Sequence, residues 1–211
     1  MYVDDHDRKQ IQALSKIVKP EWTFADVGVC QGAMLLPMSQ MMRFGWGFEA
    51  KPSNMNYLNR IFHSVANVEI LNKAVSDTNG TVSLYEGNST HTASMNGTFI
   101  QDLMGEKGLQ RKFEVESVTL DSFFEDKDVD VIKMDIEGAE WTALAGAKNL
   151  LENRDIIWLI EFHVNEEWDN RKMLYDLGYE IYDRDTFEKL DRDIPRTYQA
   201  FVCREGRITQ H

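Results

Sequence analysis

The chain has 211 residues and a formal net charge of −12 at pH 7, a length that predicts one globular domain, residues 1–211, with a sizeable core. The negative charge and the absence of a dense Lys/Arg cluster argue against nucleic acid as a partner. No apolar run approaches the ~20 residues of a membrane span, no secretory signal is visible, and the two cysteines fit no disulfide or metal spacing, so we expect a cytoplasmic protein.

The first half of the chain alternates helical and extended patterns. Apolar residues at helical spacing predict an amphipathic helix over residues 7–18, within an N-terminal segment of residues 1–20. We expect strands over residues 22–29, 46–50 and 68–75, helices over 33–44 and 52–63, and an extended stretch over 81–85. Residues 87–112 are polar at first and weakly periodic, and we interpret them as an acceptor-side loop, since long loops in compact domains are usually functional.

The second half predicts strands over residues 113–120, 131–136 and 156–162, helices over 139–151 and 167–177, and closing strands over 179–182 and 198–203. Strands that alternate with helices are typical of an α/β fold. We therefore expect a doubly wound, mostly parallel, Rossmann-like sheet with helices on both faces and an antiparallel C-terminal strand.

The most informative segment is VIKMDIEGAE, residues 131–140. Its apolar start predicts a buried parallel strand, which delivers Asp135, Glu137 and Glu140 into a turn that contains Gly138. Ligands bind outside the carboxyl ends of strands in open α/β sheets, and acids are costly there unless they bind or react with something. We interpret Asp135 and Glu137 as functional, and Glu140 as a helix-start acid favoured by the helix dipole.

A second strand-turn-helix segment, FADVGVCQG over residues 24–32, predicts one end of a cofactor site. Cys30 stands where a dinucleotide fold has its middle glycine, and a cofactor without pyrophosphate does not need that glycine. S-adenosylmethionine has no phosphate. Backbone N–H groups from Cys30 to Gly32 would receive its carboxylate, Asp26 would hold its ammonium directly or through water, and Gly28 would keep the turn open.

Glu49 ends the next predicted strand at about the 20-residue interval after Gly28 at which an acid meets a ribose. We therefore expect Glu49 to accept the two ribose hydroxyls, in preference to a role as a solvated strand-end acid. Lys73 and Ala74 end the third strand, where the adenine should bind, mostly through backbone groups. Cys30 has no neighbouring base in any motif, so we interpret it as a small turn residue and not as a nucleophile.

Residues 23–163 resemble the FkbM family of S-adenosylmethionine-dependent methyltransferases. The resemblance implies a class I methyltransferase fold and O-methylation of a hydroxyl on a sugar, a glycan or a secondary metabolite. Cys30 and Gln31 are modest departures, standing where small or amide residues are common in the family. The segments that carry the resemblance are DVG (26–28) with Gly32, EAKP (49–52), AVSD (74–77), VTLDSF (118–123), IKMDIEGAE (132–140), AGA (145–147) and EFH (161–163).

Methyl transfer to a hydroxyl needs alignment and a base. Asp135 should lie closest to the methyl group, Glu137 at the lip of the site, and His163 at the end of the neighbouring strand. His163 is our first choice as general base because its unperturbed pKa is near neutral, with Asp135 orienting it or holding the acceptor hydroxyl. The alternative for His163 is a structural bond to a loop carbonyl.

Three other interpretations remain open. A divalent metal, Mg²⁺ or Mn²⁺, bound by Asp135, Glu161 and His163 would activate the hydroxyl as a Lewis acid, although we favour the metal-free base. A binding module that keeps the cofactor but acts through a partner would lack acids at the reactive end, and these are present. An NAD-dependent oxidoreductase would share the fold and the ribose acid, but the missing middle glycine argues against it.

Overall fold

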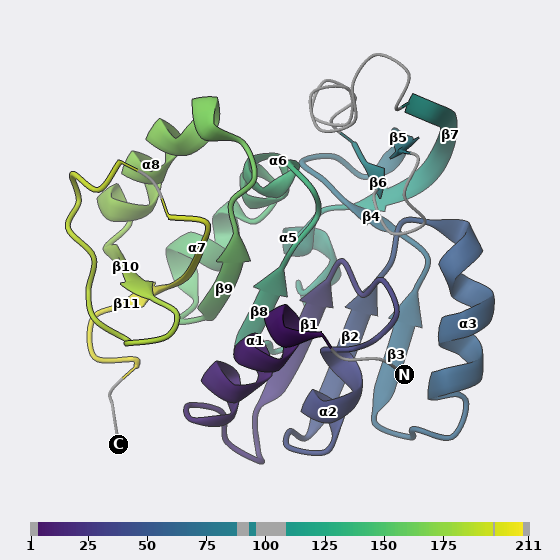
Figure 1. The fold of residues 1–211 in the computed structure, drawn as a ribbon, viewed down its shortest axis with the longest axis horizontal. Helices are drawn as coiled ribbons and strands as arrows, with labels where there is room; N and C mark the ends of the chain where they lie inside the picture. The colour runs from purple at the N-terminus through teal and green to yellow at the C-terminus, as the bar shows by residue number, and fades with distance from the viewer. Residues whose placement is uncertain (1–3, 88–92, 96–108, 196, 209–211) are drawn as a thin grey trace.

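The computed structural model describes residues 4–87, 93–95, 109–195 and 197–208 (Figure 1). Its centre is a seven-stranded sheet with the order β10-β11-β9-β8-β1-β2-β3. Neighbours from β9 to β3 are parallel, whereas β11 runs antiparallel to both β9 and β10. The bounds are β1 Thr23–Val27, β2 Phe44–Phe48, β3 Val68–Leu71, β8 Val131–Met134, β9 Ile157–Glu161, β10 Tyr179–Asp183 and β11 Gln199–Arg204.

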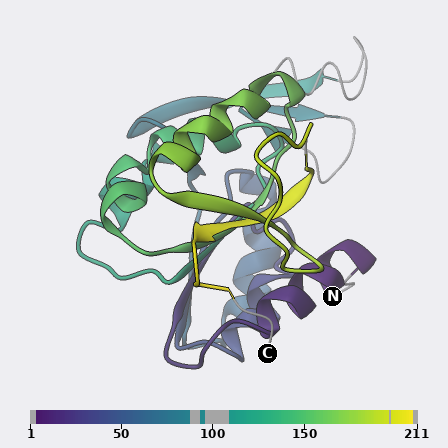
Figure 2. The ribbon, with the colours of Figure 1, turned by 90° about the vertical axis from the view of Figure 1, so that its left-hand side faces the viewer.

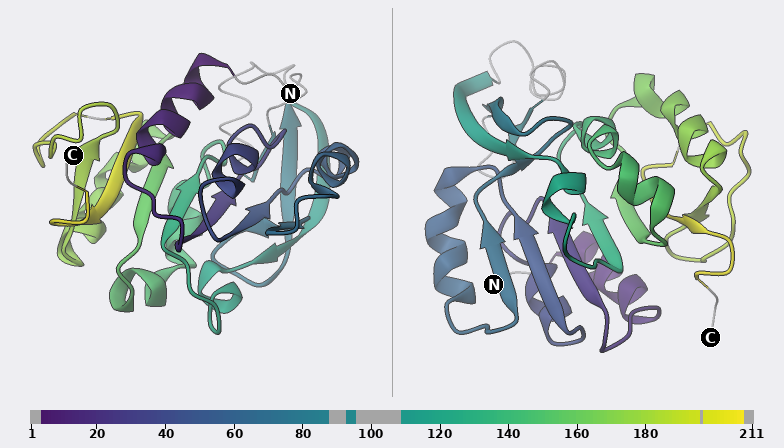
Figure 3. Two further views of the ribbon diagram at one scale, coloured as in Figure 1. Left: turned by 90° about the horizontal axis from the view of Figure 1, so that it is seen from below. Right: turned by 180° about the vertical axis from the view of Figure 1, so that it is seen from behind.

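Helices cover both faces of this sheet (Figures 1 and 3). One face carries α1 (Asp5–Ser15), α2 (Leu35–Ser39) and α3 (Pro52–Phe62). The other carries α5 (Leu120–Phe123), α6 (Glu140–Ala145), α7 (Lys148–Asn153) and α8 (Arg171–Asp176), the last preceded by the 3-10 helix η1 (Asn165–Asn170). Figure 2 views the edge formed by β10 and β11, with α1 and α8 on opposite sides. The predicted fold class is confirmed.

The core follows the alternation of side chains along the strands. Phe24 and its partner in the register, Val131, pack into the layer formed with α1, α2 and α3. The next pair, Ala25 and Ile132, packs into the layer formed with α5 to α8. Strands buried on both faces must be apolar at successive positions, which is why these runs are recognisable in the sequence.

A second sheet, of order β4-β7-β5-β6, was not predicted. It contains β4 (Ala74–Val75), β5 (Gly80–Gly87), β6 (Ala93–Ser94) and β7 (Leu109–Val118). The single strand predicted over residues 68–75 is wrong, because the chain leaves the central sheet after Leu71, where the Asn72 side chain donates to the carbonyl of Glu49 at 2.7 Å. Most of the predicted acceptor-side loop, residues 87–112, lies outside the described residues.

Two predicted helices are shorter than expected. The helix over residues 139–151 is divided into α6 and α7 at Gly146, where a Cβ atom would lie 2.1 Å from the carbonyl oxygen of Ser76. The helix over residues 33–44 is reduced to α2, and the Asn67 side chain donates to the carbonyls of Ser39, the last residue of α2, and of Met42 after it. Within the described part of the chain, no helix has the length and apolar character needed to cross a membrane.

Asp121 caps α7, the helix that follows the division at Gly146. Its carboxylate accepts from the backbone N–H groups of Asn149 and Leu150, both at 2.9 Å, which caps the first turn of α7. Loss of such a cap costs about 1 kcal/mol. We therefore predict that Asp121→Ala lowers the free energy of unfolding by about this amount, measured by chemical denaturation. Asp126→Ala removes an equal charge from an exposed site and should leave stability unchanged; equal losses in both variants would contradict the capping role.

Candidate active site

The carboxyl ends of β1, β2, β8 and β9 surround a cavity of about 440 Å³. The position follows from the topology: β1 lies between β2 and β8, so the strand order reverses beside it, and such a switch point forms a crevice. The size is within the usual range for small-molecule sites. The cavity is lined by nine of the residues singled out in the sequence: Gly28, Cys30, Glu49, Lys73, Ala74, Asp135, Glu137, Glu161 and His163.

Asp26 and Gly32 do not line the cavity. Asp26 is completely buried, and its Oδ1 lies 3.3 Å from Nζ of Lys133. Asp26 therefore does not reach the cavity surface, and its expected role toward a cofactor ammonium, directly or through water, stays a prediction. Gly32 lies against Phe62, where a Cβ atom would come within 2.7 Å of the ring, so its role is to let α3 pack against the turn.

The backbone N–H groups of Cys30 and Gly32, in the turn after β1, donate to acceptors within the protein. The N–H of Cys30 donates to Oε2 of Glu49 at 2.7 Å, and the N–H of Gly32 donates to the carbonyl of Val29 at 2.8 Å. Two of the N–H groups expected to receive the cofactor carboxylate are thus engaged inside the protein. Burial and the charge of Glu49 raise the pKa of the Cys30 thiol to about 11, so the thiol stays protonated near neutral pH, which disfavours a nucleophilic role.

Glu49 connects this turn to the start of α3. Besides Cys30, its carboxylate accepts from the N–H of Lys51 at 2.7 Å. Burial raises the pKa of Glu49 to about 7, although the two backbone N–H donors oppose the shift. An ionised carboxylate has about four acceptor positions, so Glu49 retains capacity for ligand hydroxyls. Lys73, on the same side of the cavity, forms an ion pair with Glu116.

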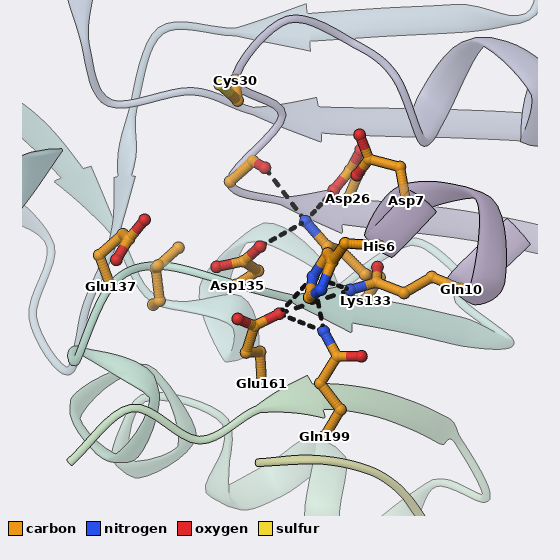
Figure 4. A network of polar contacts seen from close by, with 12 residues as sticks. His6, Asp7, Gln10, Asp26, Cys30, Lys133, Asp135, Glu137, Glu161 and Gln199 are labelled. Atoms are coloured by element: carbon orange, nitrogen blue, oxygen red, sulfur yellow. Dashed lines mark hydrogen bonds and ion pairs between the residues drawn. The ribbon is translucent and has the colours of Figure 1, made fainter. Parts of the chain in front are cut away.

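Lys133 holds the acids of β1 and β8 together (Figure 4). Its Nζ lies 3.3 Å from Asp26 and 3.7 Å from Asp135, and it donates to the carbonyl of Gly28 at 3.2 Å. Burial alone would lower the pKa of Lys133, but the charges of Asp26 and Asp135 raise it further than burial lowers it. The ammonium group therefore stays protonated. The sequence analysis assigned Lys133 no role.

His163 lies among four carboxylates. Its Nδ1 is 2.8 Å from Glu140, and its Nε2 is 3.3 Å from Glu161, 3.7 Å from Glu137 and 3.8 Å from Asp135. Burial lowers the pKa of His163, but the hydrogen bonds to Glu140 and Glu161 outweigh it and raise the pKa to about 10. The imidazole is thus protonated at neutral pH. The near-neutral pKa that made His163 our first choice as general base is not present here.

Glu140 is more than a helix-start acid. It is 1% exposed and accepts from the N–H groups of Ile136 and Gly138 as well as facing His163. Glu137, by contrast, lies at the cavity surface, in a left-handed conformation with φ of 56°. Burial and the neighbouring Asp135 raise the pKa of Glu137 to about 7. A carboxylate with this pKa is well matched to proton transfer near neutrality.

Helix α1 supplies residues that the sequence analysis missed. Asp7 and His6 line the cavity, and His6 Nε2 lies 2.8 Å from Oε2 of Glu161 at the end of β9. Tyr198, which precedes β11, is half exposed beside them, with its ring centre 5.5 Å from that of His163. No local pattern signals these contacts, because the pairs are formed between elements distant in the sequence.

Two groups of described side chains have the composition and spacing of metal ligands: His6 with Asp135 and Glu161, and Asp135 with Glu137 and His163. In each group the ligand atoms lie within 4.8 Å of one another. Of the three ligands considered in the sequence analysis, Glu161 belongs to the first group, His163 to the second and Asp135 to both.

Comparison with known proteins supplies the family. The sequence profile of the Methyltransferase FkbM domain matches residues 26–190. No curated protein matches the chain significantly. Among solved structures, an FkbM methyltransferase from Methylobacillus flagellatus KT is similar, with a TM-score of 0.57 and 16% identity over 88% of this chain and 44% of that one. The present chain thus spans less than half of that protein.

Two further structures are similar. A SAM-dependent O-methyltransferase from Thermotoga maritima has a TM-score of 0.54 and 15% identity, over 97% of this chain and 66% of that one. A Streptococcus mutans protein in complex with S-adenosylhomocysteine (SAH) has a TM-score of 0.52 and 8% identity, over 96% and 99%. At these identities the likenesses show the fold alone.

The geometry at Gly28 gives a test of how the turn after β1 is built. Gly28 has φ of +91°, and a Cβ atom there would lie 1.9 Å from the carbonyl oxygen of Asp135. We predict that Gly28→Ala lowers the free energy of unfolding by about 1–3 kcal/mol more than a matched control. The control is Gly178→Ala, which has a similar φ of +81° but open space around the new atom. Equal losses of stability in denaturant titrations would show that backbone strain alone acts at Gly28.

Proposed function

The chain belongs to the FkbM methyltransferase family, and from this premise we propose that it transfers a methyl group from S-adenosylmethionine to a hydroxyl oxygen of a sugar, a glycan or a secondary metabolite. The observation that carries the proposal is the cavity that joins Glu49, at the end of β2, to Asp135 and Glu137, after β8. This arrangement combines a ribose-binding acid with acids that can act on an acceptor.

The residues of the cavity fit the cofactor. Glu49 would bind the ribose hydroxyls, Ala74 and the backbone beside Lys73 would contact the adenine, and the open turn at Gly28 would lie along the methionine part. Among the described lining residues, Asp7, Asp135 and Glu137 are acids that would attract the positively charged sulfur of the cofactor. When bound, S-adenosylmethionine supplies a methyl group on a positively charged sulfur.

At the other end, the protein must orient the acceptor and take its proton. We assign the proton-accepting role to Glu137, because its carboxylate is at the cavity surface and is not held by a backbone cap as Glu140 is. Asp135, fixed by Lys133, would accept a hydrogen bond from the acceptor hydroxyl. His163 would position both acids as a cation, because Glu140 and Glu161 keep it protonated. A positioned base typically contributes about 10²–10⁴-fold to the rate.

The two rival interpretations receive less support. A cofactor-binding module without catalysis does not need Asp135 and Glu137 at the cavity surface. An NAD-dependent oxidoreductase needs a middle glycine that lets the backbone approach a pyrophosphate, and Cys30 stands in that position. Acceptor activation by Glu137 needs no metal, so the alternative of a divalent metal at Asp135, Glu161 and His163 stays outside this proposal.

Calorimetric titration tests the cofactor assignment. We predict that the protein binds SAH and not NAD, and that Glu49→Gln weakens SAH binding about 10- to 100-fold, the cost of losing charge-assisted hydrogen bonds of about 1.5–3 kcal/mol. Binding of NAD in preference to SAH, or full SAH affinity in Glu49→Gln, would overturn the assignment.

The pH dependence of SAH binding tests whether the ionised form of Glu49 binds the ligand. The pKa of Glu49 is about 7 in the free protein, so its carboxylate is ionised above pH 7 and protonated below it. Because the ionised form binds the ribose better, SAH affinity should fall as the pH drops below 7, by up to about tenfold per unit. Glu49→Gln carries no titrating group at this position and should show a smaller change.

Turnover tests the role of Glu137. Glycan and metabolite extracts should first be screened by mass spectrometry for a product that gains one methyl group. With that acceptor, Glu137→Gln should lower kcat by about 10²–10⁴-fold. The affinity of the variant for SAH should stay within a factor of about two of the wild-type value. Glu152→Gln, an exposed change on α7, is the matched control. Wild-type turnover in Glu137→Gln would remove this residue from the mechanism.

A further inference from the structure

Helix α1 precedes the segment matched by the family profile, residues 26–190, yet it forms part of the cavity. The contact is made by His6, 155 residues away in the sequence from its partner Glu161. Figure 4 shows side chains from α1, β9 and β11 meeting at this point. The helix is therefore attached to the reactive end of the site through polar groups, which is unusual for an element that packs on the sheet by its apolar face.

The nitrogen at the centre of this contact has more neighbours than it can satisfy. His6 Nε2 lies 2.8 Å from Oε2 of Glu161, 2.7 Å from the amide nitrogen of Gln199 and 2.9 Å from that of Gln10. An imidazole nitrogen carries either one proton or one lone pair. In either state it can make one good hydrogen bond, so two of the three neighbours are not satisfied by it.

Gln10 gives a second, independent indication that the point between His6 and Glu161 suits a ligand. Its side chain is 2% exposed and is directed at His6 and Glu161, and its Oε1 is buried with no hydrogen-bond partner in the described part of the chain. The two orientations of an amide differ only by exchange of oxygen and nitrogen. Rotation by half a turn would direct the oxygen of Gln10 at the same point, where a cation would accept it as a ligand.

The acids complete a ligand set. Ligand atoms of His6, Asp135 and Glu161 lie within 4.8 Å of one another, so a single ion between them is within reach of all three after small side-chain movements. Glu161 is buried, with 5% of its surface exposed. The Oδ2 atom of Asp135 lies 3.7 Å from Nζ of Lys133, and its other carboxylate oxygen lies 3.8 Å from Nε2 of His163. Carboxylate and amide oxygens with one imidazole are a donor set suited to Mg²⁺ or Mn²⁺.

We propose that His6, Asp135 and Glu161 bind one divalent cation, Mg²⁺ or Mn²⁺, which fastens α1 to the carboxyl ends of β8 and β9. The ion takes the lone pair of His6 Nε2, and the Gln10 amide, turned by half a turn, presents its oxygen. The Gln199 amide keeps its orientation, because its oxygen accepts from Arg184 and its nitrogen donates to Glu161. The alternative is a metal-free ion pair between His6 and Glu161. The proposal does not depend on methyl transfer, since the ion is bound by the free protein.

Titration with Mn²⁺, followed by electron paramagnetic resonance of the free ion, tests the site on full-length protein stripped with EDTA. We expect one site per chain with a Kd in the micromolar range. His6→Gln should weaken this site at least tenfold, and His63→Gln, which changes an exposed histidine on the far end of α3, should leave it unchanged. Absence of a site tighter than millimolar, or unchanged binding in His6→Gln, overturns the proposal. Loss of binding in His163→Gln but not in His6→Gln also overturns it, and assigns the ion to the other ligand group.

Hydrogen exchange on the wild-type protein provides a readout that needs no variant. Mn²⁺ should slow amide exchange in α1 at least several-fold, and exchange that is the same with and without the ion contradicts the fastening role. Circular dichroism of the same preparations shows that His6→Gln is folded. SAH binding by the wild-type protein separates the two proposals: intact SAH binding without a Mn²⁺ site removes the cation alone, whereas a Mn²⁺ site without SAH binding removes the proposed methyltransferase function alone.

Discussion

The buried ammonium group of Lys133 is the interaction on which the geometry of this site depends. Its Nζ lies between the carboxylates of Asp26, in β1, and Asp135, after β8, and it also binds the carbonyl of Gly28. A buried charge without partners costs several kcal/mol, so these groups must stay together in the folded chain. The two central strands are thus joined by charge as well as by their backbone ladder, and Asp135 is presented to the cavity at a defined place.

Much of the architecture was predictable because its signals are local. Continuous apolar runs identify strands buried on both faces, and an acid directly after such a run, as with Glu49 and Asp135, lines the cavity because all parallel strands end at one edge. The same reasoning does not extend to Asp26, which lies within β1 and faces Lys133 on the neighbouring strand. A position inside the strand depends on side-chain direction and on a partner that the local pattern does not identify.

Other features are decided by contacts between distant segments. The protonation of His163 depends on Glu140 and Glu161, which belong to different elements, so its reference pKa was a poor guide. The separation of β3 from β4 depends on Asn72 and the carbonyl of Glu49, and a run of apolar residues does not reveal it. Periodicity measures burial, but it does not report which sheet a buried strand joins.

The contact between His6 and Gln199 spans 193 residues. A ribosome releases the N-terminus first, so α1 is synthesised long before β11, and the polar side of the helix has no counterpart while the chain is being made. The α1 side of the pocket can therefore form only after β11 has been synthesised. Pairing of segments so distant in the sequence is a slow step of folding.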